Sequence, residues 1–166
     1  MSLKAFLRFV CAEILARRGG MALHAAAVAF PDGVSVFLAR SGGGKTTLIR
    51  RFAADRSLGD DFCPICPVGD QLWVLPSPFQ GREGTPVTGA AGPLRCIAEL
   101  VKGESTGWAP VRWQEGVASI LKAALLHTNG VEIRRDLLDT AVRMARESRM
   151  GRLTFHLREA PWGVLA

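Results

Sequence analysis

The sequence predicts an α/β fold in which helices flank a mixed sheet. Three observations predict it. A chain of 166 residues that is 48% hydrophobic and 22% charged is long enough for one domain, residues 1–166, with a sizeable core. A strand-like apolar run, a glycine-rich loop and an amphipathic segment follow one another between Val34 and Asp55. Further short apolar runs, and two segments with helical apolar spacing, follow toward the C-terminus.

The chain opens with a predicted helix over Leu3–Arg18, whose apolar residues recur at helical spacing and which ends at Gly19-Gly20. We expect this helix to cover the sheet or to dock to a partner. Its basic residues would also suit a membrane surface, although covering a sheet is the commoner role. Two apolar runs follow, Ala22–Phe30 and Val34–Ala39, separated by the turn sequence Pro31-Asp32-Gly33. They predict an antiparallel hairpin.

The loop Ala39–Thr46, Ala-Arg-Ser-Gly-Gly-Gly-Lys-Thr, fits the pattern of a phosphate-binding P-loop with Ala in place of the first Gly. Glycines leave backbone N–H groups accessible to a phosphate and permit positive φ. Lys45 supplies a positive charge for terminal phosphates, and the Thr46 hydroxyl suits Mg²⁺. A glycine-rich turn without a ligand is the alternative. The loop predicts a nucleotide site formed by Ser41, Gly42, Gly43, Gly44, Lys45, Thr46 and Thr47.

The segment after the loop predicts a helix over Thr46–Asp55 and a return to the sheet over Leu58–Asp61. We expect an inward helix face of Leu48, Ile49 and Phe52, with Arg50, Arg51 and Arg56 outside. Asp60 and Asp61 then lie at a strand end. Beside phosphate and Mg²⁺, one carboxylate can hold the metal and the other can accept a proton from a hydroxyl. An acidic turn without function is the alternative.

The rest of the chain predicts further elements around this centre. We expect strands over Gln71–Leu75 and Pro93–Leu100, with a mobile active-site loop over Pro76–Gly92 between them. Helical spacing predicts two helices, Gln114–His127 and Val131–Met150, that form a hairpin around Asn129-Gly130. A short strand over Leu153–Leu157 and a core or interface role for Trp162 complete the prediction. The chain then divides into a covering helix, a sheet core and a helical hairpin, at residues 1–20, 21–110 and 111–150.

Charge and cysteine usage narrow the functional classes. The net charge of +6 favours anionic partners, but the arginines are scattered and no nucleic-acid-binding signature is present, so we do not expect nucleic acid as the partner. No apolar run is long enough to cross a membrane and no secretory signal is recognisable, which favours a cytoplasmic protein with reduced thiols. Cys63 and Cys66 have the spacing of half a zinc site or a redox pair, but a second pair is missing, and Pro64 and Pro67 suggest an edge strand or extended loop.

Four segments together resemble the HPr kinase/phosphorylase family. They are Leu23–Val28, Pro31–Gly33, Ser41–Thr46 and the pair Asp60-Asp61. The resemblance covers residues 21 to 62 and implies a fold like the catalytic domain of that family. The chain is too short for the separate N-terminal domain of full-length members, and the later loop associated with phosphorolysis has no match. The resemblance therefore implies a compact relative that acts as a kinase.

The resemblance also implies roles for individual residues. His24 corresponds to an active-site His that assists the Asp, Lys45 and Thr46 to the phosphate and Mg²⁺ residues, Asp60 to the base and Asp61 to the metal-associated carboxylate. The division of roles between the two acids stays open. Arg82 and Arg95 are candidates for stabilising the charge of the transferred phosphate, although most arginines are surface residues. The predicted strand that begins Pro93-Leu94-Arg95 is similar to a Pro-Leu-Arg segment in small members of the family.

These inferences predict an ATP- and Mg²⁺-dependent kinase that phosphorylates a serine hydroxyl of a protein or peptide. The family resemblance also implies possible homo-oligomers. One alternative is a regulatory or scaffold module that binds a nucleotide without phosphotransfer. Another is a basic phosphate-binding adaptor for nucleic acid, whose binding would depend steeply on salt.

Overall fold

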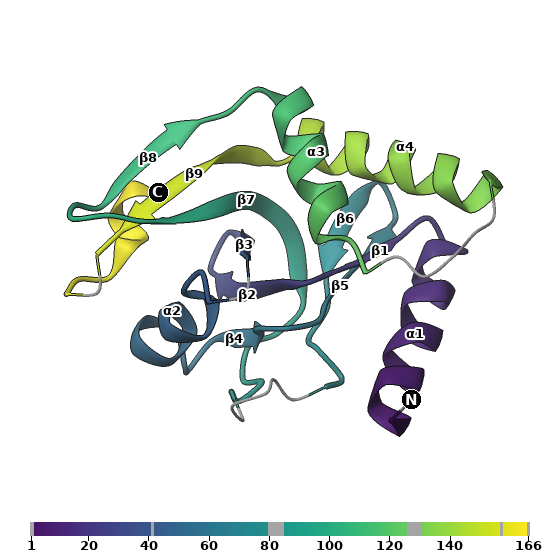
Figure 1. Ribbon diagram of the computed structural model, residues 1–166, viewed down its shortest axis with the longest axis horizontal. Helices are drawn as coiled ribbons and strands as arrows, with labels where there is room; N and C mark the ends of the chain where they lie inside the picture. The colour runs from purple at the N-terminus through teal and green to yellow at the C-terminus, as the bar shows by residue number, and fades with distance from the viewer. Residues whose placement is uncertain (1, 41, 80–84, 126–130, 157, 166) are drawn as a thin grey trace.

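The computed structural model describes residues 2–40, 42–79, 85–125, 131–156 and 158–165, without the side chains of 131–134. In these residues nine strands form one curled mixed sheet with helices on both faces (Figure 1). The strands are β1 Met21–Leu23, β2 Ala25–Phe30, β3 Gly33–Leu38, β4 Ser57–Gly59, β5 Cys63–Val68, β6 Gln71–Val74, β7 Gly92–Lys102, β8 Gly107–Pro110 and β9 Arg149–Phe155. The helices are α1 Leu3–Ala16, α2 Lys45–Phe52, α3 Trp113–Ala123, α4 Val131–Glu147 and the short 3₁₀ helix η1 Pro161–Val164.

The sheet has the order β1-β5-β6-β7-β3-β2-β4, and β9 pairs with both β7 and β8. Strand β7 runs parallel to β3 and β9, whereas the other pairs are antiparallel. This arrangement confirms the predicted α/β class with a mixed sheet and flanking helices. None of the described helices combines the length and the apolar content needed to cross a membrane.

Alternate residues of β2 and β3 face opposite sides of the sheet, as the pleat requires. On one side they pack against α3 and α4, in a cluster that includes Ala27, Val36 and Met144. On the other side they pack against α2 and the region of η1, in a cluster that includes Ala26 and Phe37. Because both faces are covered, these strands are apolar almost throughout, with the buried Ser35 of β3 as their one polar residue.

The predicted hairpin is present, with β2 and β3 paired antiparallel from Ala25–Leu38 to Phe30–Gly33. The strand before the turn was predicted as one run, and this was wrong. The chain bends at His24, so that β1 pairs with β5 while β2 pairs with β3 and β4. The backbone N–H of His24 donates to the carbonyl of Ala123 at 2.7 Å. This bend places the His24 side chain where two parts of the sheet meet.

The helix after the loop is shorter than predicted, because α2 ends at Phe52 and not at Asp55. Its residues Leu48 and Ile49 are fully buried, as expected. Arg56, predicted to lie outside, is only partly exposed, and its guanidinium lies 5.0 Å from the ring centre of Phe30 and 5.3 Å from that of Trp162. Long cationic side chains often cover aromatic rings in this way, which a helical pattern does not indicate.

The C-terminal half departs from prediction at its element boundaries. Helix α4 ends at Glu147 and β9 begins at Arg149, although the pattern predicted helix through Met150. Strand β8 was not predicted, since a four-residue strand that contains Pro110 has little sequence signal. Trp162 is partly buried and makes edge contacts with Phe30, which confirms its predicted core role. The turn at Asn129-Gly130 and His127 lie outside the described residues.

Cys63 and Cys66 lie on β5, which has β1 on one side and β6 on the other, so the prediction of an edge strand was wrong. Both cysteines are free thiols. Burial raises the pKa of Cys63 to about 12 and also raises that of Cys66, which disfavours the thiolates that bind metals or exchange disulfides. Within the described residues, no three His, Cys, Asp or Glu side chains form a group suited to a metal ion. The geometry therefore gives no support to a zinc or redox site here.

Candidate functional site

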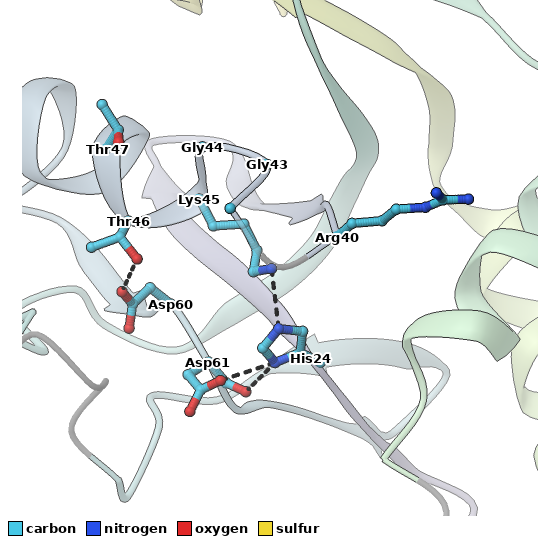
Figure 2. A pocket seen from close by; sticks show the side chains of 10 residues that line it. His24, Arg40, Gly43, Gly44, Lys45, Thr46, Thr47, Asp60 and Asp61 are labelled. Carbon is cyan, nitrogen blue, oxygen red and sulfur yellow. Dashed lines mark hydrogen bonds and ion pairs between the residues drawn. The ribbon is translucent and has the colours of Figure 1, made fainter.

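A cavity of about 450 Å³ opens where the glycine-rich loop, the start of α2 and the end of β4 meet (Figure 2). The residues that line it come from three separate stretches of the sequence. They are His24, Arg40, Gly42, Gly43, Gly44, Lys45, Thr46, Thr47, Asp60 and Asp61. The fold therefore brings together the His, the loop residues and the acid pair that the sequence singled out.

The glycines of the loop are required for different reasons. Gly42 and Gly44 have φ of +75° and +100°, a region that side-chain-bearing residues rarely adopt. At Gly43 an added Cβ would lie 2.7 Å from the Cβ of Ala39 and 2.9 Å from the carbonyl oxygen of Arg40, too close for any side chain. At Gly42 an added Cβ would meet no described atom within 4 Å, so its outer side is open. The loop thus presents backbone to the cavity.

Lys45 is the first residue of α2, and its side chain turns back across the loop. Its Nζ donates to the carbonyl of Ala39 at 2.7 Å and lies 3.2 Å from Nε2 of His24. The residue retains only 7% of its exposure. Burial lowers the pKa of Lys45, while the charges of Asp61 and Asp60 act in the opposite direction. A dianionic or more highly charged ligand in the cavity would favour the ammonium form.

Asp60 is buried and faces hydroxyl groups. Its Oδ2 accepts hydrogen bonds from the hydroxyls of Thr46 at 2.8 Å and Thr85 at 2.9 Å. Its Oδ1 is buried and has no hydrogen-bond partner among the described residues. An unpartnered buried carboxylate oxygen is costly, since such groups are normally satisfied by hydrogen bonds or by a cation. The Asp60–Thr46 pair is therefore suited to a hard cation that accepts oxygen ligands.

Asp61 faces charged groups. Its Oδ2 lies 2.7 Å from Nη1 of Arg8, and its Oδ1 lies 2.9 Å from Nδ1 of His24. The backbone carbonyl of Asp61 accepts a second bond from Arg8 at 2.8 Å and is 3.2 Å from the same His24 nitrogen. The Arg8 guanidinium also lies 5.5 Å and 5.9 Å from the ring centres of Phe62 and Phe79. Arg8 and His24 thus fix the position of Asp61.

The partners of His24 indicate one tautomer. Its Nε2 faces the Lys45 ammonium, which can only donate, whereas its Nδ1 faces the oxygens of Asp61, which can only accept. A ring with the proton on Nδ1 satisfies both contacts. His24 thereby connects Lys45 to Asp61, as Figure 2 shows, and it retains 38% side-chain exposure toward the cavity. Such a His can orient the Asp61 carboxylate through Nδ1 while Nε2 accepts from Lys45.

Most predicted site residues lie in this cavity, but not all. Ser41 and Arg82 lie outside the described residues. Arg95 does not line the cavity: its Nε pairs with Asp32 at 2.7 Å and its Nη2 donates to the Leu165 carbonyl at 2.6 Å. The prediction that it stabilises a transferred phosphate is therefore contradicted by its position, because β7 directs it toward the C-terminal segment.

Three contributors were missed by sequence reasoning. Arg8 comes from α1, 53 residues before its partner, and nothing in a helical pattern indicates a contact at that separation. Thr85 comes from the loop predicted over residues 76–92, whose site role was anticipated but whose contact with Asp60 was not. The described parts of that loop are bonded to β4, for example through Ser77 N–H and Thr88 N–H. Arg40 lines the cavity, and its side chain extends away from Lys45 in Figure 2.

Comparison with known proteins adds little to this geometry. No protein-family model and no curated protein matches the chain. Among solved structures, the HPr(Ser) kinase/phosphatase from Coxiella burnetii is similar, with 13% sequence identity and a TM-score of 0.46 over 86% of this chain and 90% of that chain. Values this low assign neither a family nor an activity, so the site has to be interpreted from its own residues.

Proposed function

We propose that the chain is an ATP- and Mg²⁺-dependent phosphotransferase that phosphorylates a serine hydroxyl of a protein or peptide. One observation carries the proposal. A single cavity contains a glycine-rich loop, a lysine and two adjacent carboxylates that have different surroundings. Phosphoryl transfer needs a phosphate cradle, a metal ligand and a group that takes the acceptor proton, and these residues can supply all three. The choices of serine as acceptor and of ATP as donor both follow the family resemblance of the sequence.

The residues present fit a nucleotide and its metal. The backbone of Gly42–Gly44 and the unpaired N–H groups at the start of α2 can bind the phosphates, with Lys45 as the fixed positive charge. The Thr46 hydroxyl and the unpartnered Oδ1 of Asp60 can hold Mg²⁺. When bound, Mg²⁺ offsets negative charge on the phosphates. Few protein ligands are needed, since Mg²⁺ usually keeps waters and phosphate oxygens in its coordination shell.

Asp61 is the better placed of the two acids to act as the base. It lies in the cavity beside His24 and is held in one orientation from behind by Arg8. In the proposed reaction the acceptor hydroxyl loses its proton to the Asp61 carboxylate, which His24 keeps oriented. The acceptor oxygen bonds to the γ-phosphorus while the bond from that phosphorus to the β,γ-bridging oxygen breaks, and ADP leaves. This assignment exchanges the roles that the family resemblance implied for Asp60 and Asp61. The hydroxyl partners and buried oxygen of Asp60 favour a metal ligand, and the charged partners of Asp61 favour a proton acceptor.

A nucleotide-binding module without phosphotransfer is the second candidate. Both side-chain oxygens of Asp61 already have partners, Arg8 and His24, and a carboxylate held by two cationic or donor groups is a weaker base. In this alternative the cavity binds the nucleotide. The contacts that run from Lys45 through His24 and Asp61 to Arg8 then couple nucleotide binding to the position of α1. The two candidates share the nucleotide site and differ in the role of Asp61.

Transfer of label from γ-labelled ATP distinguishes these functions. The reaction contains Mg²⁺ and, as acceptors, the proteins or peptides encoded beside this gene. The proposal expects label in an acceptor with wild type, none with Lys45→Ala, and none with Asp61→Asn, which should still bind ATP. Bound ATP without label in any acceptor would support the binding module. Failure of wild type to bind ATP at all would contradict both candidates.

A further inference from the structure

Helix α1 exposes its large apolar side chains and buries small ones, whereas an amphipathic surface helix usually buries its large apolar side chains. The side chains that it buries are small, Ala12 and Ala16, at 7% and 6% exposure. Its large apolar side chains face outward instead: Leu3, Phe6, Leu7 and Ile14 are 73%, 45%, 43% and 47% exposed. These four residues follow the spacing of a single helix face and form a stripe about 16 Å long at 1.5 Å per residue. Large apolar side chains gathered on one exposed face indicate an interaction site.

Charges beside the stripe restrict what can cover it. Lys4, Arg17 and Arg18 are exposed at its two ends, whereas Glu13 is the only acid in the helix sequence. In an antiparallel pair of two copies, Lys4 of one would face the arginines of the other, and in a parallel pair the arginines would face each other. Like charges at these positions, in a chain with a net charge of +6, oppose self-association through this face. An acidic partner has the complementary charge.

The inner side of the same helix reaches the candidate site. Arg8, one position after the exposed Leu7, bonds both the side chain and the backbone carbonyl of Asp61. A segment that covers the stripe of α1 therefore lies close to the cavity, and a polypeptide docked there could present a nearby hydroxyl to Asp61. A bilayer would cover the stripe equally well, but it would not account for a contact between this helix and a carboxylate in the cavity.

We propose that the exposed stripe of α1 docks an acidic amphipathic helix of the polypeptide acceptor. The inference rests on the proposed function for the identity of the partner as the acceptor, although the docking surface itself can be tested without catalysis. The apolar face of the partner would cover Leu3, Phe6, Leu7 and Ile14, and its acidic flanks would face Lys4, Arg17 and Arg18. This mode of recognition is that of a helix seated on an apolar strip with charged edges.

Two synthetic peptides of 18 residues test the surface directly. Both carry the same leucine stripe, and their flanks are either glutamate or lysine. Fluorescence anisotropy should show the glutamate peptide binding at least about 10-fold more tightly than the lysine peptide. Leu7→Glu and Ile14→Glu should each weaken that binding about 10-fold, the loss expected for one buried leucine or isoleucine contact. Leu138→Glu is the matched control, because Leu138 on α4 is 45% exposed and lies on another helix, and it should change nothing.

The following results would each contradict the docking inference. No binding of the glutamate peptide, equal binding of both peptides, or binding that Leu7→Glu leaves unchanged would contradict the surface. Binding of phosphatidylglycerol vesicles that Leu7→Glu removes, without peptide binding, would assign the stripe to a membrane. A dimer in sedimentation that Leu7→Glu converts to a monomer would assign it to a second copy.

Label transfer separates this inference from the proposed function. If wild type phosphorylates an acceptor and Leu7→Glu does so equally well at low acceptor concentration, the docking inference fails and the proposed function stands. If the glutamate peptide binds at α1 but wild type transfers no label to any acceptor, the proposed function fails, and α1 is then a docking surface of a binding module. Both inferences together predict that Leu7→Glu raises KM for the acceptor and leaves ATP affinity unchanged.

Discussion

Asp60 and Asp61 are neighbours in sequence, yet they lie in different chemical surroundings. Asp60 is 5% exposed, receives two hydroxyl donors on one oxygen and keeps the other oxygen buried without a described partner. Asp61 has a side chain that is 17% exposed, and an arginine and a histidine hold its two oxygens. The neutral partners of Asp60 leave its charge to be balanced by a ligand, whereas the partners of Asp61 balance its charge within the protein.

The difference arises from where β4 ends. Consecutive residues at the end of an extended strand point in different directions, so Asp60 is directed under the glycine-rich loop and Asp61 toward α1. Two adjacent carboxylates can therefore take separate tasks in one cavity without repelling each other at close range. The geometry favours metal binding at Asp60 and proton acceptance at Asp61. Substitutions at Asp61, Arg8 and Thr85 each perturb one side of the site and not the other, whereas Lys45 is influenced by both acids.

The largest effect is expected from Asp61→Asn. The amide keeps the size of the carboxylate but cannot accept the acceptor proton, so label transfer should fall by about 10²–10⁴-fold, the range for loss of a general base. ATP affinity should stay within about 3-fold of wild type, since no loop contact is lost. Single-turnover transfer and equilibrium ATP binding measure the two effects. If Asp61→Asn transfers label at a rate close to that of wild type, Asp61 is not the base.

A smaller effect is expected from Arg8, which acts through Asp61. Arg8→Met should lower transfer about 10-fold to 100-fold, a range typical of groups that orient a functional side chain. Arg8→Lys should recover little of the loss, because an ammonium cannot reproduce the two bonds that a guanidinium makes to Asp61. Equilibrium ATP binding should stay close to that of wild type in Arg8→Met, since Arg8 is not among the residues that line the cavity. A loss of transfer that Arg8→Lys fully restores would contradict the role of the two guanidinium bonds.

Thr85→Val perturbs the surroundings of Asp60 and leaves those of Asp61 unchanged. The substitution removes one hydroxyl donor to Asp60 and keeps the side-chain shape, so we expect a stability loss of about 1 kcal/mol. It should also change the Mg²⁺ concentration that half-saturates ATP binding by a few fold, roughly the effect of one neutral hydrogen bond. The ratio of transfer rates between wild type and Asp61→Asn should stay the same in this background. If the ratio became much smaller in the Thr85→Val background, the effects of the two acids on transfer would not be independent.

The smallest effect concerns Lys45, whose pKa both acids influence. Burial lowers its folded pKa below the ordinary 10.5, so the unfolded chain binds the extra proton in the window between the two values. Stability contributed by this group therefore rises as pH increases through that window. In urea unfolding, wild type should gain stability relative to Lys45→Met as the pH rises toward 10.5. A relative loss would mean that Asp60 and Asp61 stabilise the ammonium more than burial destabilises it.

Local patterns predicted the parts of the site that are close in sequence. The hairpin, the glycine-rich loop, Lys45 and the acid pair all lie as their spacing indicates, because short turns and strand ends are encoded locally. Contacts between residues that are far apart in the sequence were not predictable. The Arg8–Asp61 pair, the bend at His24 and the outward apolar face of α1 depend on how the sheet curls. Helical spacing located that apolar face correctly but could not indicate that it faces outward, since smaller alanines form the buried side.

The Mg²⁺ dependence of ATP binding tests the division of roles most directly. ATP affinity would be measured with and without Mg²⁺ for wild type, Asp60→Asn and Asp61→Asn. The geometry predicts that Mg²⁺ strengthens ATP binding in wild type and in Asp61→Asn, and that this gain disappears in Asp60→Asn. If Asp61→Asn loses the gain and Asp60→Asn keeps it, the roles are reversed. If neither substitution affects it, the unpartnered oxygen of Asp60 does not hold the metal, and the central claim is wrong.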